Sequence, residues 1–236
     1  MKKILFIICA SVLFYGCSSI SFHPEAYVES FENYDSFEIK TTNFEKREIN
    51  CAEYQIKFQN VSNKVSQSTI LGFGKKKGVI SQKGTVYKNG SELFDVTFIN
   101  EINDFIREKF TSETILTDSK ITMLLNEHLI EFLTEEDGFL IKEHGSFDYS
   151  ISQISTYKNE HGKIYNMAFD VVMGARIDID ENLYAVIDYY SNPSKIRLNR
   201  DFSGDLSEEE RDFLFALMLC VYHYETYFVG TTSNDA

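Results

Sequence analysis

The stretch from Phe213 to Tyr222 restricts the fold more than any other, because all ten of its residues are apolar or aromatic. Just before it, Ser207 followed by Glu210 forms a capping box, in which each side chain satisfies a free backbone N–H of the other residue. This predicts a helix that begins near Ser207. A helix that is apolar on every face must be surrounded. The stretch covers about 15 Å, roughly half a bilayer, so we expect protein rather than lipid to surround it.

Segments with a period of two residues predict the strands that enclose this helix. The clearest are Thr85–Lys88 and Ser91–Phe98, because Asn89-Gly90 between them supplies the positive φ angles of a two-residue hairpin turn. Further strands are expected around 147–151, 164–173, 177–179, 184–190 and 196–198, with turns at 180–182 and 192–194. These short connections favour antiparallel pairing.

Two other segments have apolar residues spaced by three and four, which predicts amphipathic helices packed on the sheet. They run from Ile99 to Phe110 and from Ile121 to Leu133. The expected fold class is therefore α+β, with mainly antiparallel strands around a buried C-terminal helix and two additional amphipathic helices. The strands either close into a barrel or form a sheet with helices on one side.

The segment Gly84–Val96 and the Phe213–Tyr222 helix resemble the tubby-like superfamily, which includes scramblase-like and plant LURP-one-related proteins. The resemblance covers about residues 69 to 230. It implies a closed β-barrel wrapped around the apolar helix. The two amphipathic helices do not belong to that architecture, so a generic α+β sheet stays open as the alternative.

The first sixteen residues are typical of a secretory signal. Lys2 and Lys3 precede an apolar run from Ile4 to Tyr15 that only Ser11 interrupts, and this run is shorter than the roughly 20 residues of a transmembrane helix. Residues 1–16 are therefore expected to be a signal peptide. Residues 17–48 are expected to be an anchor and tether, and 49–236 a single globular domain, since no Pro-rich or Gly/Ser-rich linker divides the chain.

The end of this run resembles a lipobox, in which a small residue precedes the cysteine that receives diacylglycerol. Gly16 and Cys17 carry the resemblance, whereas Phe14 and Tyr15 replace the usual Leu and small residue. It implies a bacterial lipoprotein precursor that carries palmitate-type acyl chains on Cys17. Two alternatives to lipidation stay open, namely ordinary cleavage of the signal peptide and an N-terminal anchor that is not cleaved. By resemblance to enteric sorting rules, Ser18 favours the outer over the inner membrane.

Composition restricts the partners. Without residues 1–16 the chain keeps 21 basic and 36 acidic residues, a net charge of −15. Such a chain repels phosphate backbones, so no nucleic-acid partner is expected. The expected partners are the membrane, through the N-terminal lipid, and an envelope protein or a lipid ligand. Cys51 and Cys220 could form a disulfide, although a buried free thiol fits the apolar surroundings of Cys220 at least as well.

Few residues indicate a chemical site. Lys75, Lys76 and Lys77 stand out in an acidic chain, and the tubby-like resemblance implies contact with an anion or a lipid headgroup; an exposed turn is the alternative reading. The acidic residues from Asp178 to Asp188 fail the calcium-loop spacing, because Leu183 and Tyr189 hold the sixth and twelfth places. The five histidines show no ligand spacing. We therefore assign no metal, cofactor or catalytic residue.

These observations favour a lipid-anchored cell-envelope protein with a non-enzymatic binding role and an unknown ligand. Two alternatives stay open. One is a lipid-anchored hydrolase whose site has no recognisable motif, and the other is a structural subunit of an envelope assembly.

Overall fold

The computed structural model describes residues 32–42, 47–70, 73–109, 112–116, 120–133, 138–142, 149–158, 163–166, 172–202 and 206–228. The expected signal peptide, Cys17 and the first part of the tether lie outside these ranges. Within them, no helix is both long enough and apolar enough to cross a membrane.

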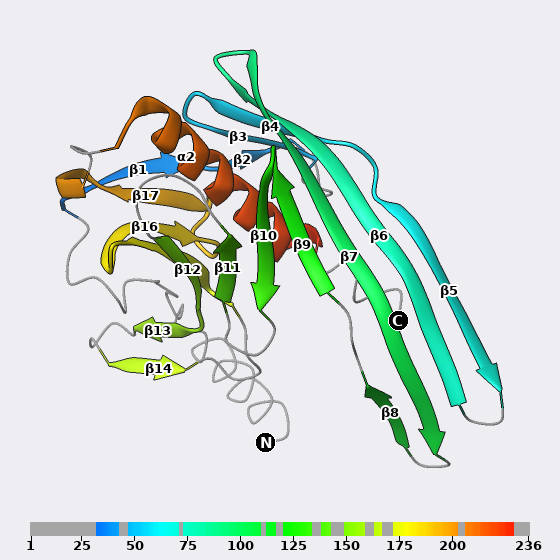
Figure 1. The fold of residues 1–236 in the computed structure, drawn as a ribbon. Helices are drawn as coiled ribbons and strands as arrows, with labels where there is room; N and C mark the ends of the chain where they lie inside the picture. Colours follow the sequence, from blue (N-terminus) through cyan, green and yellow to red (C-terminus); the bar gives the residue numbers. More distant parts are fainter. Residues whose placement is uncertain are drawn as a thin grey trace, which may run out of the picture.

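The described chain is mainly antiparallel β-structure with one helix at its C-terminal end (Figure 1). The strands are β1 (Tyr34–Glu38), β2 (Lys40–Thr41), β3 (Glu48–Cys51), β4 (Tyr54–Phe58), β5 (Ser62–Ile70), β6 (Phe73–Lys88), β7 (Ser91–Lys109), β8 (Ser112–Leu116), β9 (Lys120–Leu125), β10 (His128–Leu133), β11 (Gly138–Lys142), β12 (Tyr149–Ile154), β13 (Thr156–Lys158), β14 (Ile164–Asn166), β15 (Gly174–Ile179), β16 (Asn182–Asp188) and β17 (Lys195–Asn199). The α-helix is α2 (Glu208–His223), which continues into the π-helical turn η4 (Tyr224–Phe228); a short 3-10 turn, η3 (Arg200–Phe202), precedes it.

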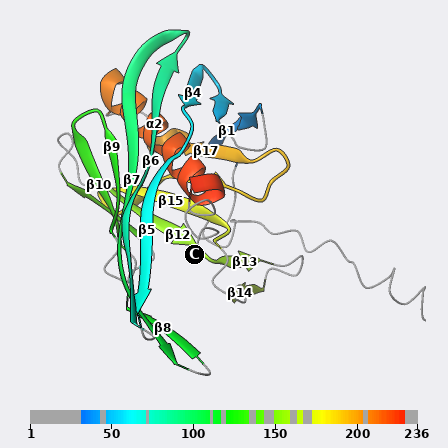
Figure 2. The same ribbon diagram turned by 90° about the vertical axis from the view of Figure 1, so that its right-hand side faces the viewer.

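One large sheet curves around α2 (Figure 2). Its strand order is β1-β17-β16-β15-β12-β11-β10-β9-β7-β6-β4-β3-β2, with β5 paired to β6 and β8 paired to β7. Strands β5, β6 and β7 extend past the helix as a long arm (Figure 1). A separate pair, β13-β14, lies beside the large sheet.

Of the two alternatives for the strands, the closed barrel implied by the tubby-like resemblance is wrong. Among the described strands, β1 pairs with β17 at one edge of the sheet and β2 pairs with β3 at the other, and no ladder joins the two edges. Yet β1 and β2 follow each other in the chain, separated by Ile39 alone. The segment 34–41 therefore passes from one edge to the other. We call the opening between β1 and the β3–β4 turn the seam.

The apolar helix is enclosed as its sequence predicts. Every residue from Phe213 to Tyr222 is at most 5% exposed, because the sheet curves around the helix. The capping box is present, with the Glu210 N–H donating to Ser207 Oγ at 3.2 Å and the Ser207 N–H donating to Glu210 Oε2 at 2.8 Å.

The prediction of two amphipathic helices is wrong. The described chain therefore contains less helix than the predicted α+β class implied. Residues 99–109 belong to β7, and residues 121–133 form the hairpin of β9 and β10. Asn126 turns this hairpin with a φ of 52°. On β7, inward-facing Phe98 and Ile102 alternate with buried, polar Asn100, which hides the two-residue period.

The other strand predictions are largely confirmed. Asn89 and Gly90 have positive φ and join β6 to β7. Asp180 and Glu181 likewise join β15 to β16 in two residues. Of the expected strand 164–173, residues 164–166 form β14 and residues 172–173 belong to no strand, while residues 167–171 lie outside the described ranges.

Candidate functional site

The seam opens into a pocket of about 510 Å³, which we call the seam pocket. It lies over the first turns of α2, between β1 and β17 on one side and the β3–β4 turn on the other. Its lining residues are Phe37, Ala52, Glu53, Tyr54, Lys88, Tyr184, Leu198, Glu208, Arg211, Asp212 and Phe215.

The helix supplies the floor of the seam pocket. Glu208, Arg211, Asp212 and Phe215 are spaced by three and four residues, so they share one face of α2. Ser207 starts the helix at the pocket, which places Glu208 and Arg211 at its rim and the Asp212 carboxylate in its floor. The capping box therefore marks the end of the helix that lies at the pocket.

A buried polar network holds this floor to the sheet. The Tyr54 hydroxyl donates to Asp212 Oδ1 at 2.5 Å, and Lys88 Nζ donates to the same oxygen at 2.7 Å. Lys88 also pairs with Glu208 Oε1 at 2.9 Å and with Glu53 Oε1 at 3.8 Å. Tyr54 and Asp212 are both 6% exposed, so Asp212 is a buried carboxylate with a cation and a hydroxyl as its partners.

These contacts determine the protonation of the network. Hydrogen bonds to Asp212 and then to Glu208 raise the pKa of Lys88 above its ordinary value, so the ammonium stays charged. Burial, followed by the bond to Asp212, raises the pKa of Tyr54. Burial raises the pKa of Tyr184 to about 12 despite the nearby Arg211 guanidinium. At neutral pH the pocket therefore offers neutral tyrosine rings beside fixed charges.

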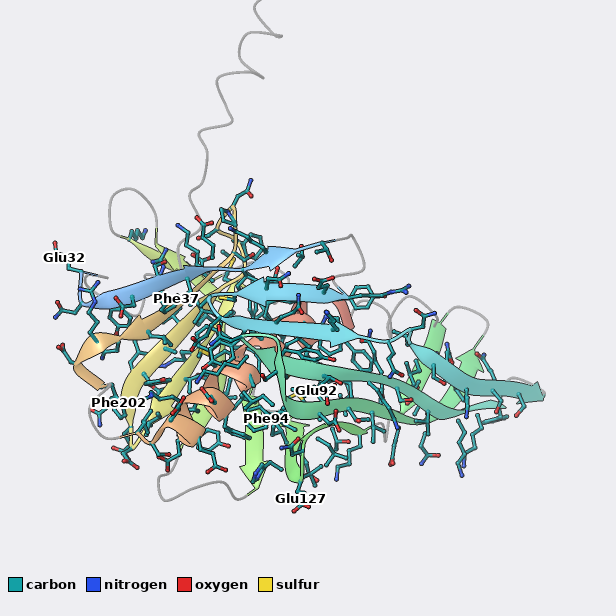
Figure 3. The ribbon with its side chains drawn as sticks, turned by 90° about the horizontal axis from the view of Figure 1, so that it is seen from above. Glu32, Phe37, Glu92, Phe94, Glu127 and Phe202 are labelled. Atoms are coloured by element: carbon teal, nitrogen blue, oxygen red, sulfur yellow. The ribbon has the colours of Figure 1, made fainter. Side chains whose placement is uncertain are left out.

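Aromatic rings form the apolar wall. The Tyr54 ring stacks on Phe215 with centroids 4.3 Å apart, and Phe37 meets Phe215 edge-on at 5.8 Å. Figure 3 shows Phe37 and Phe94 on opposite sides of α2, and Phe94 contacts Phe213 edge-on at 6.2 Å. Phe37 thus belongs to the pocket side of the helix and Phe94 to the arm side.

This arrangement suits a ligand that is apolar at one end and polar at the other. The volume falls in the range of about 300–1,000 Å³ that is usual for binding pockets. The rings can bury an apolar group, whereas Glu53, Glu208 and Arg211 stand at the rim for polar contacts.

The three lysines that the sequence singled out do not act as one cluster. They lie on strand β6, so the alternative reading of an exposed turn is wrong, and the alternation of the strand places Lys75 and Lys77 on its exposed face. Lys76 points to the opposite face, is 8% exposed and lies opposite Asp104 on β7. The prediction of an anion or headgroup contact therefore stays for Lys75 and Lys77, which share one exposed face, and no longer includes Lys76.

The two cysteines of the described chain are free and buried, so the disulfide alternative is not realised. Of the histidines, His128 meets Phe213 edge-on at 5.1 Å. His223 is fully buried, and its Nε2 lies 2.8 Å from Gln82 Oε1. His23, His144 and His161 lie outside the described ranges. Within those ranges, no three His, Cys, Asp or Glu side chains gather in a way that could hold a metal ion.

Sequence reasoning missed the pocket residues on the sheet. Tyr54 and Asp212 are 158 positions apart and match no motif. The one useful signal was the capping box, which located the start of α2 but not the strands that it meets.

Fold and site together define a class of protein, an open antiparallel β-sheet curved around a buried C-terminal helix, with a pocket at the opening of the sheet. Comparisons with protein-family models, with curated proteins and with solved structures found no match.

Proposed function

We propose that this protein is a lipid-anchored cell-envelope lipoprotein that binds a ligand in the seam pocket without transforming it. The seam pocket is the observation that carries the binding role, since aromatic rings line it and charges stand at its rim. Its polar core is internally hydrogen-bonded, because Tyr54 and Lys88 both donate to Asp212 Oδ1. Such a network stiffens a binding site rather than leaving a free group for proton transfer.

The N-terminal sequence supports the anchor. Lys2, Lys3 and the apolar run that follows lead to Gly16-Cys17, and Ser18 favours the outer membrane. Several acyl chains at Cys17 would hold the protein stably at the membrane.

Expression of the wild type and Cys17→Ala in a diderm bacterium tests the anchor. We expect palmitate label, the added mass of the lipid, and membrane fractionation for the wild type alone. Equal labelling of the two chains, or none in either, would overturn this part of the proposal.

Native mass spectrometry of the full chain, purified from its membranes, tests the binding role. Leu198→Trp fills the pocket with a larger side chain, while Val79→Trp adds the same ring at a position that is 40% exposed on the arm. We expect a bound mass with the wild type and Val79→Trp that is lost with Leu198→Trp. The same bound mass in all three chains would mean that the ligand does not occupy the seam pocket.

A further inference from the structure

Strand β1 uses only one side of its backbone to bond the sheet. The Arg200 N–H donates to Asn33 O at 2.9 Å and the Ile39 N–H donates to Ser194 O at 2.8 Å, so odd-numbered residues face β17. Hydrogen-bonded pairs alternate along an antiparallel ladder. The N–H and C=O groups of Ser36 and Glu38 therefore point the other way, toward the seam.

On that side the neighbouring strand ends too early to meet them. The Thr42 N–H donates to Glu48 O at 3.2 Å, and Lys40 lies opposite Asn50. The next partner along this ladder would be Ala52, but Ala52 has a φ of 51° and turns the chain into β4. In the part of the chain that the structure describes, no hydrogen bond reaches the backbone of Ser36 or Glu38 from this side.

A second cavity of about 450 Å³ lies where that partner would be, which leaves room beside the unbonded edge. Its lining residues are Ser36, Phe37, Glu38, Lys40, Asn50, Cys51 and Ala52. It shares Phe37 and Ala52 with the seam pocket, so the edge of β1 and the aromatic wall form one continuous surface.

We propose that the ligand of the seam is an extended peptide segment of another protein, which adds a strand to the free edge of β1. This rests on the proposed function, in which the seam pocket is the binding site. Residues on one side of a strand repeat every ~6.8 Å, and Ser36 and Glu38 present their N–H and C=O groups at this repeat. An extended peptide satisfies both pairs at once, as in other cases of strand addition.

The side chains of the seam define the peptide further. An apolar or aromatic side chain of the peptide enters the seam pocket beside Phe37 and Phe215. Residues beside it are polar, because Glu38, Glu53 and Glu208 stand along the opening together with Lys40, Lys88 and Arg211, so the lining carries both signs of charge.

Selection from a phage library of random octapeptides on the full-length chain tests this inference. The enriched peptides are then synthesised with single backbone N-methyl groups, which remove one N–H donor at a time. Binding is measured to the wild type, Ser36→Pro and Ser36→Ala. Ser36→Pro removes the seam-facing N–H without touching the β17 ladder, and proline is tolerated at such an edge. Ser36→Ala keeps the N–H.

We expect N-methylation at alternate peptide residues to weaken binding at least tenfold, and methylation at the residues between them to have little effect. Ser36→Pro should weaken binding at least tenfold, whereas Ser36→Ala should not. If Ser36→Pro does not fold, the alternation in the N-methyl series decides the question alone. Equal tolerance of methylation at every position, or no enrichment of peptides over the Leu198→Trp chain, overturns the inference. A pocket-dependent small molecule in the mass spectra would then leave the proposed function standing without it.

Discussion

The Tyr54 hydroxyl donates a hydrogen bond to Asp212 Oδ1 at 2.5 Å, which ties β4 to the second turn of α2. The Tyr54 ring stacks on Phe215 one turn further along the same helix. Tyr54 therefore fixes both the polar and the apolar side of the seam pocket.

Tyr54→Phe should lower the free energy of unfolding by about 1–2 kcal/mol, because it removes a donor from a buried carboxylate and leaves the ring in place. Lys88 stays bonded to Asp212, which limits the loss. Urea unfolding of the full chain measures the change. Tyr87→Phe is the matched control, since Tyr87 is half-buried and its ring, rather than its hydroxyl, faces Lys57. Equal effects of the two substitutions would contradict the role of the Tyr54 bond.

The buried thiols should be unreactive while the protein is folded. Burial raises the pKa of Cys51 to about 12 and raises that of Cys220 further, so little thiolate is present at pH 8. We expect iodoacetamide at pH 8 to leave both residues unmodified in the native chain and to modify both in urea. Peptide mapping after the reaction locates the label. A Cys51–Cys220 disulfide in the non-reduced digest would contradict the structure.

Gly78 is required where β5 packs along β6. A Cβ atom at this position would lie 2.2 Å from the carbonyl oxygen of Lys64 and 2.5 Å from Val65 Cα, both of which are backbone atoms. Gly78→Ala should therefore push β5 away and cost about 1–3 kcal/mol of local stability. Hydrogen exchange should speed up at the amides of residues 62–70, while exchange in α2 stays unchanged. Lys77→Ala, on the exposed face of the same strand, should leave both regions unaffected.

The sequence predicted the parts of the fold that depend on local chemistry. The capping box at Ser207 and the hairpin turn at Asn89-Gly90 are confirmed, because both patterns specify backbone geometry within a few residues. The enclosure of the apolar helix is confirmed for a similar reason, since a helix without a polar face has no stable exposed position.

The error over residues 121–133 has an identifiable cause. Met123 and Leu125 alternate inward on β9, and Ile130 does the same on β10, but a two-residue turn separates the strands. Across such a turn, two alternating patterns produce spacings of three and four that imitate a helix. Asn126, which takes the positive φ of that turn, was the signal that could have shown the hairpin.

The seam pocket could not be predicted from local sequence patterns. Tyr54, Lys88 and Asp212 meet only because the order of the strands brings β4 and β6 together beside the start of α2. The seam could not be predicted from local sequence either. The β2–β3 ladder ends early because the chain turns at Ala52, which has a positive φ. Alanine rarely adopts a positive φ, so its presence gave no signal for this turn.

Glu225 should make stability depend on pH. It lies in the π-helical turn η4, where Gln153 Nε2 donates to its Oε1 at 2.5 Å. Burial raises the pKa of Glu225 to about 7, although the bond from Gln153 acts in the opposite direction. In the unfolded chain this carboxyl has a pKa of about 4.3. Between these two values the folded state binds the proton and the unfolded state does not.

This carboxyl therefore contributes stability that is fully present below pH about 4.3 and is lost as the pH rises through about 7. The wild type should lose on the order of 3 kcal/mol of unfolding free energy over this interval, relative to Glu225→Gln, which keeps an oxygen for Gln153 to bond but cannot ionise. Urea unfolding of both chains at pH 5 and pH 8 measures the difference, and other titrating groups cancel between them. Parallel pH dependence of the two chains would show that Glu225 ionises without cost, and that water reaches its carboxylate in the folded protein.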